Sequence, residues 1–374
     1  MALKTHVVGR SQQSESLRRV LLGQTRGDGR LTIQSIEGPG GIGKTTLLDH
    51  VRSGTPLTDR RYLRLSLRGQ GSGLTSAFQA VQSLVKSASI DGVADASLPS
   101  RFPEVHRVSA AFDRLVRDGI DTLQRDPDLA GIDPKVLLRL FDAAVAFGKP
   151  LNQTIKVTRD YLDFDEIARH REKLERGLGT LAPFLAEAPR WIDRIRPGGT
   201  FVLRNALRTN ALEPLAVALE QDLRTILDAR APLSDILKPR QSGHGKVERL
   251  LLEIDDYEST SASIGRLLVD HLLPKLARAP FDTLVVMLGR DQLVNTDPGW
   301  AQHFGRNLCE PIVLDTLTRP EVDELCAFQG IESAADRERV WNDTRGYPLQ
   351  VELWLDEMRQ SGGQPTGGPS ATAL

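Results

Sequence analysis

A glycine-rich segment has the residue types and spacing that bind a phosphate chain. It matches the pattern G-x-x-x-x-G-K-[ST] in full and reads Gly38-Pro39-Gly40-Gly41-Ile42-Gly43-Lys44-Thr45. Glycines let the backbone wrap until its N–H groups face phosphate oxygens, and a following helix adds its positive amino-terminal end. Lys44 would then neutralise the β and γ phosphates, and Thr45 would offer a hydroxyl to Mg²⁺. The pattern predicts a nucleoside triphosphate site, with an ordinary glycine turn as the alternative.

Two adjacent carboxylates, Asp255 and Asp256, follow an apolar run at 250–254 and are the expected partners of this segment. A magnesium ion on the phosphates needs a carboxylate on its far side. We assign Asp255 to the metal shell and Asp256 to orienting or deprotonating the attacking water, with Glu258 as a reserve base. The alternative is an acidic pair at a helix amino terminus. Glu253 is unusual here, because a central strand seldom buries a lone carboxylate.

Two arginines are candidates for contacts with the γ phosphate. Arg290 follows the apolar run 283–288, and it would emerge near the γ phosphate if that strand lies beside the one that ends at Asp255. A solvated loop residue is an equal alternative for Arg290. Arg306 is a weaker candidate for a finger that acts across subunits, and a plain surface arginine is the favoured interpretation.

Short apolar runs and amphipathic stretches predict the elements that position these residues. Strands are predicted at 31–36, 62–67, 250–254 and 283–288. Helices are predicted at 45–53, directly after the glycine segment, and at 74–88. Each of the two later strands ends in charged residues, as buried parallel strands do when their carboxyl ends open onto a site.

These elements predict an α/β P-loop NTPase fold, with a parallel sheet flanked by helices, a large all-helical insertion and a small helical lid. Amphipathic helices broken by Pro and Gly fill the middle of the chain, and the clearest apolar stripe covers 103–124. The expected parts are the first part of the core at 1–91, the helical insertion at 92–245, the second part of the core with its Walker B and sensor strands at 246–310, the lid at 311–360 and a disordered tail at 361–374.

The composition excludes several classes of protein. The 374 residues include 48 basic and 49 acidic side chains, so the net charge of −1 gives no global field for nucleic acid or anionic membranes. Cys309 and Cys326 fit neither a disulfide framework nor a four-ligand zinc site. No Ser, Cys or His constellation suits nucleophilic catalysis, and only Mg²⁺ with nucleotide is indicated as a metal. The start lacks the apolar core of a secretory signal, so we expect a soluble, cytoplasmic protein.

Five segments resemble, in their order, those of STAND-type ATPases, the signal-transducing branch related to AAA+ and NB-ARC proteins. They are HVVGR at 6–10, GPGGIGKTT at 38–46, LLLEIDD at 250–256, VVMLGR at 285–290 and GYPL at 346–349. The resemblance implies that the loop through Thr46 binds ATP or ADP, and that the base lies between the lid residue Pro348 and the bordering residues Val8, Gly9 and Arg10. It also implies a switch between compact ADP and open ATP states.

The chain departs from that family in two ways. Roughly 180 residues separate the second strand from the aspartate pair, where one crossover needs a few tens, so an insertion of about 140 residues is expected. About 20 residues follow the lid, which leaves no room for the winged helix and repeat array that usually receive a signal. Either this sequence is part of a longer chain, or the helical insertion and a separate protein perform that task.

The leading hypothesis is an ATP-binding and slowly hydrolysing switch, an ATPase that couples its nucleotide state to a protein partner through the helical insertion. A nucleotide-dependent homo-oligomer is left open. One alternative is a DNA-remodelling AAA+ ATPase of the initiator or loader type, which is not favoured because no winged helix follows the lid. The other is a non-catalytic scaffold stabilised by nucleotide. Three aromatic residues of the insertion, Phe141, Phe147 and Trp191, would line a partner groove or, as we favour, pack in its core.

Overall fold

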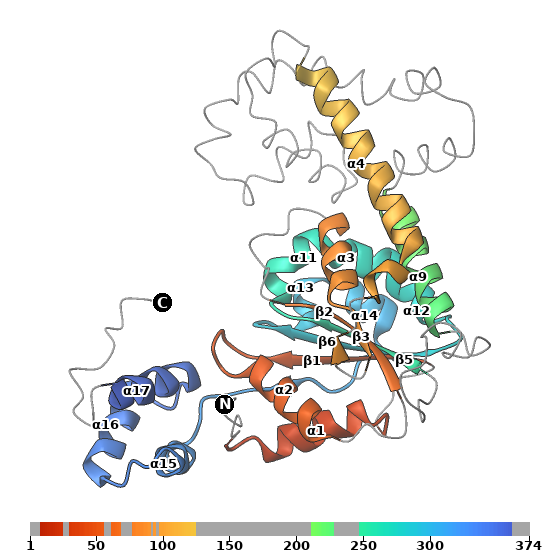
Figure 1. Cartoon of the computed structure of the whole chain (residues 1–374). Coiled ribbons are helices and arrows are strands. Elements are labelled where there is room, and N and C mark those ends of the chain that lie inside the picture. Colours follow the sequence, from red (N-terminus) through yellow and green to blue (C-terminus); the bar gives the residue numbers. More distant parts are fainter. Residues whose placement is uncertain are drawn as a thin grey trace. The chain divides into compact units, whose positions relative to one another are not determined.

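The computed structural model describes eight ranges of the chain (Figure 1). They are residues 8–24, 30–55, 61–68, 77–90, 93–94, 97–124, 211–227 and 247–360. The predicted tail and most of the expected insertion, including Phe141, Phe147 and Trp191, lie outside these residues. Within the described ranges, no helix is both long and apolar enough to cross a membrane.

A central sheet has seven described strands in the order β4-β3-β2-β5-β6-β1-β7. Their bounds are β1 Leu31–Glu37, β2 Arg61–Leu67, β3 Ser89–Ile90, β4 Val93–Ala94, β5 Val247–Ile254, β6 Asp282–Gly289 and β7 Ile312–Val313. β1 pairs with β7 in parallel, whereas β3 pairs with β2 and with β4 in antiparallel fashion. Helices flank this mixed, mostly parallel sheet, which confirms the predicted α/β architecture.

Four predicted strands, at 31–36, 62–67, 250–254 and 283–288, are confirmed as β1, β2, β5 and β6. The expectation of a wholly parallel sheet was wrong, because β3 and β4 add an antiparallel edge. β4 also lies within 92–245, where we expected only helices. The sequence between β3 and β4 is Asp-Gly, a pair typical of tight hairpins, and this signal was missed.

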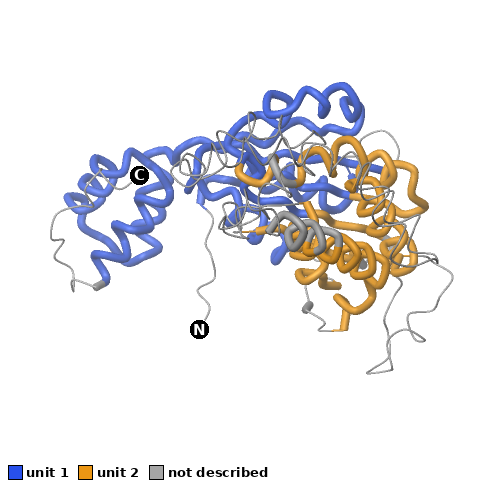
Figure 2. Tube along the Cα trace, turned by 90° about the horizontal axis from the view of Figure 1, so that it is seen from above, with its two compact units in different colours: residues 1–59, 253–258, 284–374 blue, residues 60–252, 259–283 orange. Residues whose placement is uncertain are grey.

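The chain forms two compact units, which Figure 2 shows in different colours. Unit 1 comprises residues 1–59, 253–258 and 284–374, and unit 2 comprises 60–252 and 259–283. Strands β5 and β6 contribute residues to both units. All the predicted site residues belong to unit 1.

In unit 1, the helices α1 Ser11–Leu21 and α2 Lys44–Gly54 pack against each other. α2 buries Leu47, Leu48 and Val51, the apolar stripe that the sequence predicts, and α1 buries Leu17, Val20 and Leu21. Two short helices, α13 Leu293–Thr296 and α14 Gly299–Phe304, follow β6. Helix α11 Tyr257–Arg266 begins just after the aspartate pair and contributes residues to both units.

Three further helices of unit 1, which we call the C-terminal helical segment, cover residues 319–360. They are α15 Arg319–Phe328, α16 Ala334–Thr344 and α17 Pro348–Gln360. They share an apolar cluster of Leu317, Val322, Cys326, Val340, Val351, Trp354, Leu355 and Met358. A capping box between Thr318 and Glu321 fixes the start of α15, because each side chain bonds the backbone of the other residue.

In unit 2, the helices α3 Ala77–Lys86, α4 Pro103–Gln124 and α9 Leu212–Leu227 pack in sequence order, followed by the π-helical turn η3 Leu267–Leu272 and the short α12 Leu273–Leu276. The short 3₁₀ turn η1 Pro99–Arg101 precedes α4. α4 has the bounds that its apolar stripe predicts. Asp222 of α9 is 2% exposed and accepts hydrogen bonds from the backbone N–H groups of Glu104 (3.2 Å) and Val105 (2.9 Å) at the start of α4. α4 and α9 are therefore joined by polar capping as well as apolar packing.

Candidate functional site

The glycine-rich segment connects the carboxyl end of β1 to the start of α2, as predicted. All of β1 is buried, and this strand lies between β6 and the edge strand β7. Gly38 has φ 145° and Gly43, which caps α2, has φ 96°. At Gly38 a Cβ would lie 2.7 Å from the carbonyl oxygen of Leu314, so a side chain is excluded there by the backbone angle and by the neighbouring strand.

Lys44 lies within this loop and is 7% exposed. Its Nζ donates hydrogen bonds to the carbonyl oxygens of Gly38 (2.6 Å) and Pro39 (3.0 Å). Burial lowers the pKa of Lys44, and the carboxylates of Glu258, Asp255 and Asp256 oppose that shift. The loop therefore holds a desolvated cation, whose cost an anionic ligand would offset.

Asp255 at the end of β5 lies beside Thr45 in the first turn of α2. The Thr45 hydroxyl donates a hydrogen bond of 2.8 Å to Asp255 Oδ2. A hydroxyl and a carboxylate are oxygen donors of the kind that Mg²⁺ prefers. The two predicted metal ligands, 210 residues apart in the sequence, therefore meet at one place and fit that ion.

Asp256 occupies an unusual backbone conformation next to this pair. Its φ of 50° lies in the left-handed region, which costs a non-glycine residue about 1 kcal/mol. The Asp256 N–H donates to Oδ1 of Asp255 at 3.0 Å, and the Asp256 side chain is exposed. The tight bend thus turns the Asp255 carboxylate toward α2 and leaves Asp256 accessible.

Arg290, which follows β6, forms an ion pair with Glu258 in the first turn of α11. Arg290 Nε lies 3.1 Å from Glu258 Oε1, and the Arg290 backbone N–H donates to Glu258 Oε2 at 3.1 Å. A Cβ built on Gly40 would lie 3.2 Å from the Arg290 guanidinium, so this side chain reaches the loop. The Arg290 side chain is also 64% exposed, as the solvated alternative expects, and its contact with the γ phosphate stays a prediction. Glu258, the reserve base, contacts Arg290.

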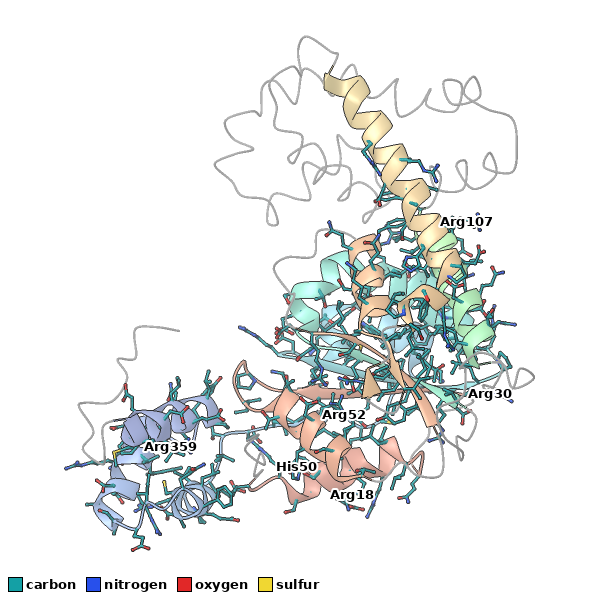
Figure 3. All side chains as sticks on the ribbon, in the orientation of Figure 1. Arg18, Arg30, His50, Arg52, Arg107 and Arg359 are labelled. Carbon is teal, nitrogen blue, oxygen red and sulfur yellow. The ribbon has the colours of Figure 1, made fainter. Side chains whose placement is uncertain are left out.

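A second pair of residues joins α2 to β5 below the Thr45–Asp255 pair. Glu253 is buried, and its Oε1 lies 3.2 Å from NH1 of Arg52. Figure 3 labels Arg52 on α2. Arg52 also contacts Asp49 at 2.9 Å. Sequence reasoning missed Arg52, although it lies seven residues after Thr45 and so on the same face of the helix, while Glu253 shares a strand face with Asp255. The pairing explains how a central strand can bury Glu253.

The segment 8–10 packs near the linker that precedes α15. Val8 is 5% and Arg10 is 7% exposed, and the Arg10 guanidinium donates to the carbonyl oxygen of Asp315. Burial lowers the pKa of Arg10, against the opposing effects of Glu321 and Asp315. Gly9 has φ 71°, and a Cβ there would collide with the Glu321 carboxyl group.

The GYPL residues at the start of α17 contact the glycine loop. The Tyr347 hydroxyl donates to the carbonyl oxygen of Gly40, and the Leu349 N–H donates to that of Gly41 at 3.2 Å. The Leu349 side chain covers Gly41, where a Cβ would lie 2.9 Å from it. Pro348 is the first residue of α17 and lies between these two contacts. Tyr347 was not among the predicted site residues.

The remaining predicted residues have plainer environments. Ile42 is 1% exposed and belongs to the core below the loop, whereas Thr46 is exposed on α2. Arg306 is exposed between α14 and β7, in keeping with the favoured interpretation of a surface arginine. Of the cysteines, Cys326 is buried in the C-terminal helical segment, Cys309 is half-buried, and both are free thiols.

The described residues thus bring together a glycine loop, a buried lysine, a hydroxyl–carboxylate pair and an arginine held by a glutamate. The comparisons with known proteins add no identity to this geometry: no protein-family model matches the chain, and no curated protein is similar enough to it to be counted as a relative.

Proposed function

We propose that this chain binds ATP with Mg²⁺ at residues 38–46 and hydrolyses it slowly. The hydrogen bond from Thr45 to Asp255 carries the proposal, because it joins the last residue of the phosphate-binding motif to the carboxylate expected to complete a magnesium site. An ordinary glycine turn would need neither a buried lysine in the loop nor a carboxylate from another strand at its hydroxyl.

Each charged side chain of the site has a proposed task. Lys44 binds the β and γ phosphates, and Thr45 and Asp255 hold Mg²⁺, which when bound would neutralise part of the phosphate charge. Asp256, exposed at the bend, orients or deprotonates the attacking water. Arg290 senses the γ phosphate, and its ion pair with Glu258 supports that role by holding the guanidinium next to the loop.

The resemblance to STAND-type ATPases extends the proposal to the base and to a switch. Val8, Gly9 and Arg10 would border the adenine, and Pro348 would pack on it. The C-terminal helical segment would act as the lid. The contacts of Tyr347 and Leu349 with the loop support the proposed lid, because a change in loop conformation would alter these contacts at the start of α17.

The output of the switch would be a protein partner, contacted through the expected helical insertion, and ATP would also favour a homo-oligomer. The packing of α4 on α9, and of α9 on η3, supports a route from the core to this part of the chain. A lone buried carboxylate at Glu253 would favour the alternative of a non-catalytic scaffold. Its ion pair with Arg52 removes that argument.

Calorimetry with ATP and Mg²⁺ tests the proposal. Lys44→Ala should lose at least a hundredfold in affinity, whereas the control Lys86→Ala, which removes an exposed lysine of α3, should bind like the wild type. Asp256→Asn should retain binding while turnover falls about a hundredfold, the scale of general base catalysis. Full ATP affinity in Lys44→Ala would refute the site.

Two further measurements separate the alternatives. Affinity purification with wild type and Asp256→Asn, each in ATP and ADP, should recover a partner in one nucleotide state only. Turnover that DNA stimulates, and that salt steeply weakens, would instead support the DNA-remodelling ATPase. Tight nucleotide retention without turnover would support the scaffold.

A further inference from the structure

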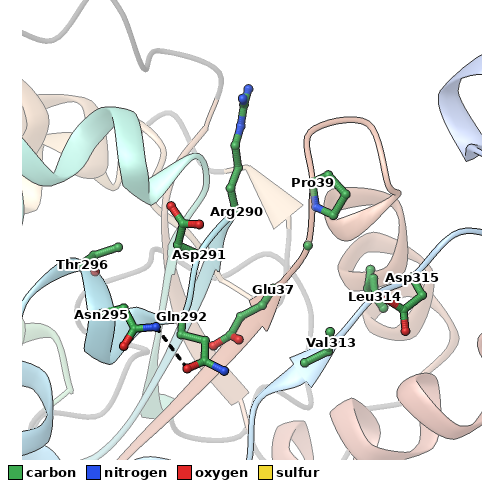
Figure 4. A pocket seen from close by; sticks show the side chains of 11 residues that line it. Glu37, Pro39, Arg290, Asp291, Gln292, Asn295, Thr296, Val313, Leu314 and Asp315 are labelled. Atoms are coloured by element: carbon green, nitrogen blue, oxygen red, sulfur yellow. Dashed lines mark hydrogen bonds between the residues drawn. The ribbon is translucent and has the colours of Figure 1, made fainter.

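A cavity of about 470 Å³ lies in unit 1 beside the phosphate loop, where β1, β6 and β7 end (Figure 4). This volume falls within the roughly 300–1,000 Å³ of small-molecule sites. Apart from Arg290, its polar side chains come from β1, from the β6–α13 connection with α13, and from the residues after β7: Glu37, Asp291, Gln292, Asn295, Thr296 and Asp315. No task in the proposed ATPase uses these six side chains.

The cavity carries an excess of negative charge. Glu37, Asp291 and Asp315 contribute three carboxylates, while Arg290 is the one basic residue in the described lining. The Arg290 guanidinium is paired with Glu258, and in Figure 4 its side chain points away from that of Glu37. A ligand that complements this lining must therefore bring positive charge.

Glu37 is the buried carboxylate of the cavity, whereas Asp291 and Asp315 are exposed. It is 6% exposed, and Figure 4 shows its carboxylate extending from β1 toward Gln292. Among the described residues, the one hydrogen bond of its carboxylate is a 2.8 Å bond that Oε1 accepts from the neutral Ser35 hydroxyl. Glu37 is also part of the cavity lining.

Two other carboxylates of this chain show what Glu37 lacks. The buried Glu253 has the guanidinium of Arg52 at 3.2 Å, and Glu213 has Nζ of Lys275 at 2.6 Å. A buried carboxylate is costly unless a cation and hydrogen bonds compensate it. A ligand cation in the cavity would supply to Glu37 what Arg52 supplies to Glu253.

We propose that this cavity binds a small organic cation, whose ammonium or guanidinium group pairs with Glu37. The amides of Gln292 and Asn295 would bond its remaining polar groups, and Asp291 at the mouth would add a second charge contact. The cavity shares Gly38, Pro39 and Arg290 with the proposed ATP site. Cation binding is measured without nucleotide, so its test does not depend on the ATPase proposal.

Ligand-observed NMR on the full chain without nucleotide tests this proposal. The probes are butylamine, butylguanidine and agmatine, with butanol as the neutral control and Mg²⁺ as the metal control. We expect the cations to bind, and butanol and Mg²⁺ not to compete with them. Glu37→Gln should weaken cation binding at least tenfold, whereas Glu332→Gln, which removes the same charge from an exposed position, should leave it unchanged.

Asp291→Asn provides a second variant, because Asp291 is exposed and its substitution disturbs no core packing. It should weaken agmatine binding severalfold and should leave thermal unfolding unchanged. The proposal is overturned if no cation binds the wild type at 10 mM, about the weakest affinity a specific site would show. Equal binding of butanol, displacement by Mg²⁺, or undiminished binding to a folded Glu37→Gln variant would overturn it as well.

Discussion

Replacing Arg52 by alanine should destabilise unit 1 by about 3 kcal/mol. The change leaves the Glu253 carboxylate, which is 1% exposed, without the guanidinium that lies 3.2 Å away. Removing one partner of a buried ion pair costs roughly 3–5 kcal/mol, because the remaining charge stays desolvated. We take the lower end of that range, because the Arg52 side chain is itself 19% exposed and water can enter where it was.

Urea unfolding of wild type, Arg52→Ala, Glu253→Leu and the double variant Arg52→Met/Glu253→Leu measures this cost. The double variant should recover most of the loss, because an apolar pair of similar volume removes the stranded charge. Arg18→Ala serves as the control. Its ion pair with Glu15 has side chains that are 48% and 49% exposed, so its loss should cost less than about 1 kcal/mol. A cost for Arg52→Ala no larger than that of Arg18→Ala, or a double variant as unstable as the single one, would refute the reasoning.

Two other predictions concern the C-terminal helical segment and unit 2. Tyr347→Phe removes the hydrogen bond to the Gly40 carbonyl, worth about 1 kcal/mol, so hydrogen exchange in the first turn of α17 should speed up about fivefold; unchanged exchange there would contradict the contact. Glu213 lies against Lys275 and His271, whose hydrogen bonds and charges outweigh the effect of burial and lower its pKa below 4.5. Its contribution should therefore be present above pH 4.5, at most about 1 kcal/mol after screening, and be lost as the pH falls further. A stability difference between wild type and Glu213→Gln that persists at pH 3 would contradict this assignment.

Local sequence signals were sufficient to predict the structure of segments whose fold depends mainly on their own residues. The glycine pattern fixes a strand, a loop and a helix in sequence order, and the apolar stripe of α4 fixes its bounds at 103 and 124. The meeting of Thr45 and Asp255 also followed, because the carboxyl ends of parallel strands lie at one edge of a sheet.

Contacts that depend on tertiary placement were not predictable in the same way. Arg52 and Glu253 are 201 residues apart, and the sequence around either residue does not indicate that the other is its partner. The same holds for Glu258, whose role as the partner of Arg290 depends on β5 lying next to β6. Glu37 precedes the motif directly, yet its burial at the wall of a cavity depends on α13 and on the residues after β7.

The way α17 contacts the glycine loop has a consequence for how ligand and helix would share that loop. Tyr347 and Leu349 donate their hydrogens to carbonyl oxygens of Gly40 and Gly41, whereas a phosphate, having only acceptors to offer, would need the amide hydrogens of the same loop. Because opposite poles of the peptide groups are engaged, the two would not displace one another. Any coupling between the ligand and α17 would therefore depend on the backbone conformation of Gly40 and Gly41, which both would contact.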